Sequence, residues 1–184
     1  MRTLALILME AGPLSPGFHL HIDNPPWMPL DIEDIETSGP NGLPTVSVAH
    51  YGQQNGDAMR DPEMLFEMCR DGSEIALAPY YWRNDYVGIE QYSSYRDDAQ
   101  KLFTLSGLKQ QHEAFARTWD RNLRSQGFYE AFVRSRSQQP AIQWAGTGRA
   151  RLRIHARRPY KENPHDDRSS NAIRVSQPAA REPH

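Results

Sequence analysis

Apolar and polar residues alternate with a period of two in several short segments of the first hundred residues, which is the pattern of strands that bury one face. The alternation is clearest in residues 18–23, where apolar side chains separate His19, His21 and Asp23. Further strands are predicted on alternation or on β-branched and aromatic content at 28–35, 45–49, 63–69, 75–82 and 87–95. The predicted strand at 28–35 carries its acidic residues on the outer face.

Turn-forming residues separate these segments over short distances, as in Ser38-Gly39-Pro40-Asn41-Gly42 and Asp71-Gly72. A parallel crossover needs a dozen residues or more, so connections this short require antiparallel neighbours. The middle of the chain is therefore predicted to be a meander.

The spacing of apolar residues changes to that of a helix after Asp97. One face of the segment 108–123 is formed by Leu108, His112, Phe115, Trp119 and Leu123. Charged residues occupy the other positions, so this helix is expected to cover the apolar face of the sheet, with Gly127 as its stop. A shorter helix is predicted at 98–105.

The first ten residues predict a short helix that lies on the core through Leu4, Ile7 and Leu8. Their apolar run is shorter than the roughly 7–15 residues of a signal-peptide core. No segment approaches the roughly 20 apolar residues of a membrane span, so no membrane partner is expected.

Together these elements predict an α+β fold, an antiparallel meander sheet of five or six strands with helices packed on one face. We expect a single domain at 1–133, an arginine-rich arm at 134–158 and a disordered tail at 159–184, because the tail is rich in proline, serine and charge. A length of 184 residues is enough for one domain and an additional tail.

Charge is distributed unevenly along the chain. The net charge is −2, but residues 1–98 hold 5 basic and 16 acidic residues, and residues 99–184 hold 16 basic and 7 acidic ones. The single cysteine, Cys69, excludes an internal disulfide and suits a reducing cytoplasm. Its apolar neighbours predict a buried, inert thiol.

A dense polar segment at 49–64 is the first candidate site, and it is predicted to be a loop between two strands. Carboxylates of Asp57, Asp61 and Glu63 are suitable ligands for a divalent cation, with His50 as a general base. Their spacing matches no established metal motif. In the alternative interpretation the aspartates cap turns and pair with Arg60, while His50 bonds to loop backbone.

The His19-x-His21-x-Asp23 pattern is a second candidate. Strand alternation places the three side chains on one face, and two imidazoles with a carboxylate can ligate zinc. Exposed histidines on a solvent-facing strand explain the pattern equally well, so no metal or other cofactor is expected in the purified protein. A third group, Tyr80, Tyr81, Trp82, Tyr86, Tyr92 and Tyr95, is interpreted mainly as core packing.

Three motifs resemble a family of bacterial domains of unknown function: residues 25–33 (PPWMPLDIE), 49–57 (AHYGQQNGD) and 60–64 (RDPEM). The resemblance covers roughly residues 1–125. It implies one domain and a setting on plasmids, phages and integrative elements, and it carries no assigned activity.

The arm supplies a cationic run, with its densest part formed by Arg149, Arg151, Arg153, Arg157 and Arg158. Such a run can bind phosphate backbones, can pair with an acidic partner, or can be a solvated tail. The leading hypothesis is a non-enzymatic accessory or interaction protein of a bacterial mobile element. The alternatives are a metal-dependent hydrolase or nuclease acting through His50, Asp57, Asp61 and Glu63, and a nucleic-acid-binding protein acting through the arm.

Overall fold

The computed structural model describes residues 1–72 and 74–138. Its helices are α1 (Arg2–Ala11), α2 (Ser106–Ser125) and α3 (Phe128–Gln138). Its strands are β1 (His19–Ile22), β2 (Leu30–Ser38), β3 (Pro44–Gln54), β4 (Asp57–Asp71), β5 (Glu74–Asn84), β6 (Ile89–Tyr92), β7 (Ser94–Arg96) and β8 (Leu102–Thr104). From residue 139 onward, the predicted arm and the predicted tail lie outside these described residues.

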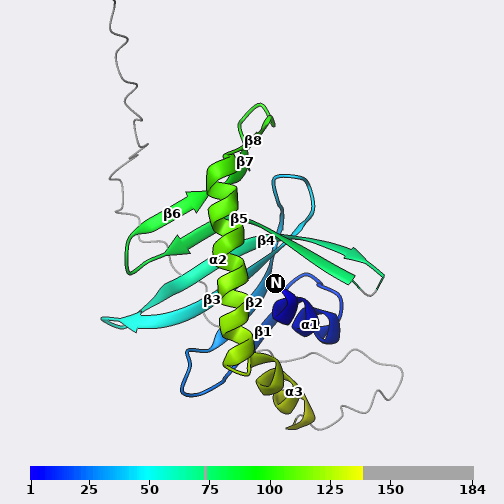
Figure 1. Ribbon diagram of the computed structural model, residues 1–184, viewed down its shortest axis with the longest axis vertical. Helices are drawn as coiled ribbons and strands as arrows, with labels where there is room; N and C mark the ends of the chain where they lie inside the picture. Colours follow the sequence, from blue (N-terminus) through cyan, green and yellow to red (C-terminus); the bar gives the residue numbers. More distant parts are fainter. Residues whose placement is uncertain (73, 139–184) are drawn as a thin grey trace, which may run out of the picture. The chain divides into compact units, whose positions relative to one another are not determined.

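The main sheet has six strands in the order β1-β2-β3-β4-β5-β6, and each strand is antiparallel to the next (Figure 1). β7 and β8 form a separate two-stranded sheet. The predicted α+β fold with an antiparallel meander is therefore confirmed.

Helices α1, α2 and α3 pack on one face of the sheet, with α2 running across the strands (Figure 1). The predicted core face of α1 is correct, since Leu4, Ile7 and Leu8 are fully buried. Trp119 and Leu123 of α2 are buried in the same cluster. The other face of the sheet carries no helix of the described residues, and we call it the open face.

The polar segment 49–64 is not a loop, which corrects the sequence-based expectation. β3 continues to Gln54 and β4 begins at Asp57, so the two strands form one long hairpin. Its turn is Asn55-Gly56, with φ of 53° and 90° at the two residues. Positive φ at both central positions is what a tight two-residue hairpin turn requires, and Asn-Gly tolerates it.

The predicted helix at 98–105 is also wrong. Leu102–Thr104 pairs instead with Ser94–Arg96 as a separate hairpin. The carboxylate of Asp97 accepts a hydrogen bond from the backbone N–H of Lys101 at 2.8 Å, which closes the turn. The predicted strand at 87–95 is accordingly divided into β6 and the start of β7.

Two further details differ from the sequence-based predictions. Cys69 is exposed rather than buried, because Met64, Phe66 and Met68 point into the core and the next residue points away. Gly127, with φ of 79°, ends α2 as expected. The chain then forms α3, a helix that the sequence did not predict and that continues to Gln138, past residue 133.

Candidate functional site

Strand register aligns polar side chains into two rows across the open face. Both follow from alternation, because residues of one parity on each strand point to the same side of the sheet. The first row contains His21, Asp31, Ala49, Glu63, Arg83 and Glu90, in the order of the strands. The second row contains His19, Glu33, Ser47, Leu65, Tyr81 and Tyr92.

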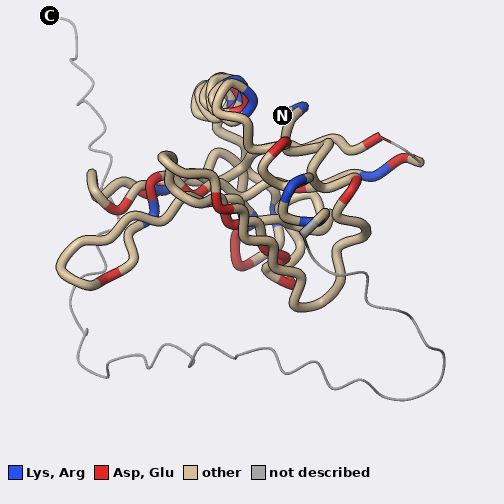
Figure 2. The backbone as a smooth tube through the Cα atoms, turned by 90° about the horizontal axis from the view of Figure 1, so that it is seen from below, with Lys and Arg blue, Asp and Glu red and all other residues tan. Residues whose placement is uncertain are grey.

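Arginines on β4 and β5 are neutralised within this face. The Arg60 Nε lies 2.7 Å from a Glu63 carboxylate oxygen, and the Arg83 Nε lies 2.6 Å from Asp85. Asp85 is partly desolvated, which opposes ionisation, but a hydrogen bond from the Arg60 backbone N–H and the Arg83 guanidinium lower the pKa of its carboxyl. Carboxylates outnumber these cations, so the face as a whole is acidic, and acidic positions are seen along the sheet in Figure 2.

Tyrosines stand among the charged groups of β5 and β6. The Tyr81 hydroxyl donates to Glu90 at 2.9 Å, and the rings of Tyr81 and Tyr92 lie 4.7 Å apart between centroids. Burial, followed by the hydrogen bond to Glu90, raises the pKa of Tyr81. The phenol therefore stays protonated and serves as a hydrogen-bond donor.

Imidazoles and carboxylates alternate at the β1–β2 edge of the open face. One oxygen of Asp31 lies 2.9 Å from His19 Nε2 and 2.8 Å from His21 Nδ1. His19 also lies 3.3 Å from Glu33, and His21 lies 3.2 Å from Asp23. His19, His21 and Asp23 thus lie on one face as predicted, and Asp31 and Glu33 of β2 add two carboxylates to this group.

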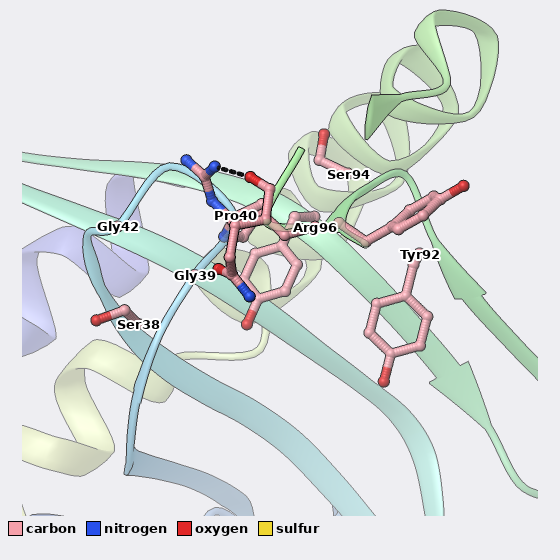
Figure 3. A pocket seen from close by; sticks show the side chains of 10 residues that line it. Ser38, Gly39, Pro40, Gly42, Tyr92, Ser94 and Arg96 are labelled. Atoms are coloured by element: carbon pink, nitrogen blue, oxygen red, sulfur yellow. Dashed lines mark hydrogen bonds between the residues drawn. The ribbon is translucent and has the colours of Figure 1, made fainter. Parts of the chain in front are cut away.

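A pocket of about 380 Å³ lies between the segment 38–42 and residues of β5, β6 and β7 (Figure 3). This volume is in the range of small-ligand sites. Its lining consists of Ser38, Gly39, Pro40, Gly42, Tyr80, Tyr92, Ser94, Tyr95, Arg96 and Gln100. The Arg96 guanidinium donates to the Gln100 carbonyl at 2.6 Å, which fixes it at the wall (Figure 3). Three of the ten lining residues are therefore tyrosines, and one, Arg96, is a cation.

His50 lies on the helix side of the sheet rather than on the open face. Its ring centroid is 5.5 Å from those of Trp119 and Phe128, and its Nδ1 lies 2.8 Å from the Pro29 carbonyl oxygen. Burial lowers the pKa of His50. The imidazole is thus a neutral group held by backbone, as in the alternative interpretation of the sequence.

The other proposed catalytic residues do not join His50. Asp57 is exposed at the tip of the long hairpin, and Asp61 accepts a hydrogen bond from the Asn84 amide at 2.7 Å. Glu63 is on the open face, where it accepts from Ser47 at 2.8 Å. The structure therefore does not gather the four side chains around one position. Arg60 pairs with Glu63 and Asp85 rather than with Asp57 or Asp61.

Sequence reasoning missed the roles of Asp31 and Glu33. Their alternation on an acidic outer strand face was visible in the sequence. Their pairing with His21 and His19 depends on the β1–β2 register, which the sequence alone did not fix. Of the tyrosine group assigned to the core, Tyr86, Tyr92 and Tyr95 are exposed. The arginines from Arg149 to Arg158 lie outside the described residues, and their role stays a prediction.

The fold and this face define a class: a small α+β domain whose meander sheet is covered by helices on one side and presents an acidic, tyrosine-bearing surface on the other. The chain belongs to the family described as domain of unknown function DUF6908, whose model matches residues 2–129. The expected membership in a family of unknown function is thereby confirmed. No curated protein and no solved structure matches the chain. Among the described helices, none is both long enough and apolar enough to span a membrane.

Proposed function

We propose that this domain is a non-enzymatic interaction protein that binds a basic, proline-containing segment of another protein on its open face. The observation that supports this proposal is the tyrosine-bearing pocket near Glu90 of the acidic open face. Extended proline-rich segments dock into aromatic-lined grooves because their conformation is already ordered, which reduces the entropy lost on binding.

The pocket walls suit proline rings. Tyr80, Tyr92 and Tyr95 contribute flat apolar faces. The hydroxyls of the exposed Tyr92 and Tyr95 are hydrogen-bond donors for peptide carbonyls, whereas the Tyr80 hydroxyl donates to Thr45. Pro40 and the adjacent glycines bring backbone close to the opposite wall. A segment without prolines lacks both the shape and the conformational preference for this pocket.

Charges around the pocket favour one orientation of the bound peptide segment. Glu90 is on the same strand and the same face as Tyr92, two positions along β6, which corresponds to roughly 7 Å. Arg96 stands at the wall of the pocket. A basic flank is therefore attracted toward Glu90 and repelled by Arg96, so one orientation of the segment is preferred.

Three short fluorescein-labelled peptides test the proposal by fluorescence anisotropy with the full chain. The first is proline-rich with an arginine flank, the second has a glutamate flank, and the third has alanine in place of proline. We expect the first to bind most tightly, and the Tyr92→Ala variant to weaken it by at least tenfold, or about 1.4 kcal/mol.

Tyr86→Ala is the matched control, because Tyr86 and Tyr92 are each 45% exposed and Tyr86 does not line the pocket. Equal affinity of all three peptides, or equal loss in both tyrosine variants, would disprove the proposed mode of recognition. Binding of single-stranded DNA in place of the peptides would assign the surface to a different partner.

A bacterial, cytoplasmic setting on a mobile element is part of the same proposal. It rests on the motif resemblance and on the single cysteine of the chain. A map of the genes that neighbour members of the DUF6908 family tests it: genes for integration, conjugation or phage functions are expected beside most of them.

A further inference from the structure

We infer that His19, Asp31 and Glu33 form a binding site for a divalent transition-metal ion of the Zn²⁺ class. This inference is independent of peptide recognition, since the three residues stand at the β1–β2 edge and none of them lines the tyrosine pocket. It also replaces the expectation that the protein holds no metal.

The ligand chemistry is that of a zinc site. Imidazole nitrogen and carboxylate oxygen are both common Zn²⁺ ligands, and three protein ligands leave a fourth position for water or another group. His19 supplies Nε2, while Asp31 and Glu33 each supply one oxygen, and these three atoms lie within 4.8 Å of one another. An imidazole in the set distinguishes it from the clusters of carboxylates that are common on protein surfaces.

The distances are close to those that coordination requires. Zinc bonds of about 2.0–2.2 Å at tetrahedral angles place neighbouring ligand atoms roughly 3.3–3.5 Å apart. His19 Nε2 lies 2.9 Å from Asp31 Oδ1 and 3.3 Å from Glu33 Oε1. Small side-chain rotations are therefore enough to admit an ion, and the paired strands need not move.

Neighbouring side chains support the ligands from outside the site. His21 Nδ1 lies 2.8 Å from Asp31 Oδ1, and His21 Nε2 lies 3.2 Å from Asp23. Hydrogen bonds of this kind orient a ligating carboxylate and commonly raise metal affinity by 10- to 100-fold. We therefore treat His21 as a positioning residue for Asp31 rather than as a direct ligand.

Charge and access also favour a cation. Asp23, Asp31 and Glu33 are joined only by the imidazoles of His19 and His21, and Arg60 and Arg83 pair with other carboxylates of the sheet. The side chains of His19 and Glu33 are 51% and 43% exposed. An ion can thus reach the site directly from solvent, and the local excess of carboxylates attracts it.

The test uses the full chain after treatment with a chelator, dialysed against Zn²⁺ or Co²⁺. We expect one equivalent of metal per chain, visible absorption of tetrahedral Co²⁺, and a higher melting temperature with Zn²⁺. His19→Gln and Glu33→Gln should each weaken binding by at least tenfold, and His21→Gln should weaken it less than either.

Two controls make the result decisive. A chain with His155, His165 and His184 replaced by glutamine keeps the three proposed ligands and should bind as the wild type does. Circular dichroism confirms that the His19 and Glu33 variants are folded. Unchanged metal binding in those two variants, or loss of binding only in the triple variant, would overturn the inference. The affinity of the His19→Gln and Glu33→Gln variants for the proline-rich peptide should remain unchanged, which separates this site from the proposed function.

Discussion

Glu67 accepts two hydrogen bonds from Asn41, one from its backbone N–H at 2.6 Å and one from its side-chain amide at 2.5 Å. Glu67 is only 2% exposed, so its carboxylate depends on these donors in place of water. The bonds hold the segment 38–43, which forms one wall of the tyrosine pocket. A buried acid on β4 therefore determines the position of a loop that lines the pocket.

Replacing Glu67 with alanine should destabilise the protein and loosen that pocket wall. The hydrogen bonds between Asn41 and the buried Glu67 carboxylate are lost, which costs about 1–3 kcal/mol in the free energy of unfolding. Urea denaturation measures the loss, and peptide affinity should fall with it. Glu74→Ala, at an exposed position on β5, is the control and should change stability by less than about 0.5 kcal/mol. An equal effect in both variants would contradict this role for Glu67.

Alternation of side chains predicted most of the fold but not the length of the β3–β4 hairpin. The core under the sheet requires Val46, Val48 and Met64 to be apolar, and this requirement produces the visible pattern. Gln53, Asp57 and their neighbours extend past the core and are exposed. No apolar periodicity is required there, so the segment looked like a loop despite its Asn-Gly turn.

Site prediction from the sequence failed for a different reason. The pairing of His21 with Asp31 and of His19 with Glu33 depends on strand register, and a shift of one residue would move every side chain to the other face. The sequence showed which residue types were present on each strand. It did not show that His50 points toward Trp119 while Glu63 points to the open face.

The N-terminus of α1 is capped from a distance by Asp120 of α2. Its carboxylate accepts hydrogen bonds from the backbone N–H groups of Arg2 at 2.8 Å, Thr3 at 3.0 Å and Leu4 at 3.3 Å. Because no side chain at the start of α1 provides a cap, Asp120→Ala should lower the free energy of unfolding by about 0.5–2 kcal/mol. Asp120→Asn should retain more stability. Thermal denaturation compares the two variants, and a Glu113→Ala variant as unstable as Asp120→Ala would argue against the cap.

His112 should make the stability of the protein depend on pH. It is 3% exposed, and neither ring nitrogen has a hydrogen-bond partner in the described residues. Burial lowers the pKa of His112 below the usual 6.5, so the unfolded chain binds more protons in the interval between the two values. Stability is therefore complete above about pH 6.5 and decreases as the pH falls toward the folded pKa, by at most about 1.4 kcal/mol per pH unit.

A His112→Leu variant tests this prediction, because leucine fills a similar space and does not titrate. Its unfolding free energy at pH 8 should equal or exceed that of the wild type. Between pH 7 and pH 5 it should lose less stability than the wild type. His50 is buried with a lowered pKa as well, so some dependence on pH should remain. Parallel curves for the two proteins would show that His112 does not contribute.

Cys69 should react as an accessible thiol in the folded protein. Its side chain is exposed on β4, one residue beyond Met68, which is buried. A chromogenic disulfide reagent should therefore modify one thiol per chain at the same rate without and with a moderate concentration of urea. The Cys69→Ser variant should fold with nearly unchanged stability, since exposed positions tolerate substitution to within about 0.5 kcal/mol. A thiol that reacts only after unfolding would restore the interpretation of Cys69 as a core residue.

The arginine run from Arg149 to Arg158 should decide whether the full chain binds nucleic acid. Each arginine that neutralises one phosphate contributes about 0.9 to the slope of log affinity against log salt concentration for duplex DNA. Replacing Arg149, Arg151, Arg153, Arg157 and Arg158 with glutamine should therefore reduce that slope by up to about 4–5 and weaken retention on any DNA sequence alike. Filter binding across a series of salt concentrations measures both quantities.

As a control, Arg117→Gln and Arg121→Gln remove exposed charges from α2 and should leave the slope unchanged. Counterion release from DNA requires that the arginine charges be present. If the five-arginine variant kept the wild-type slope, these arginines would therefore contact a protein partner or only water, and not DNA.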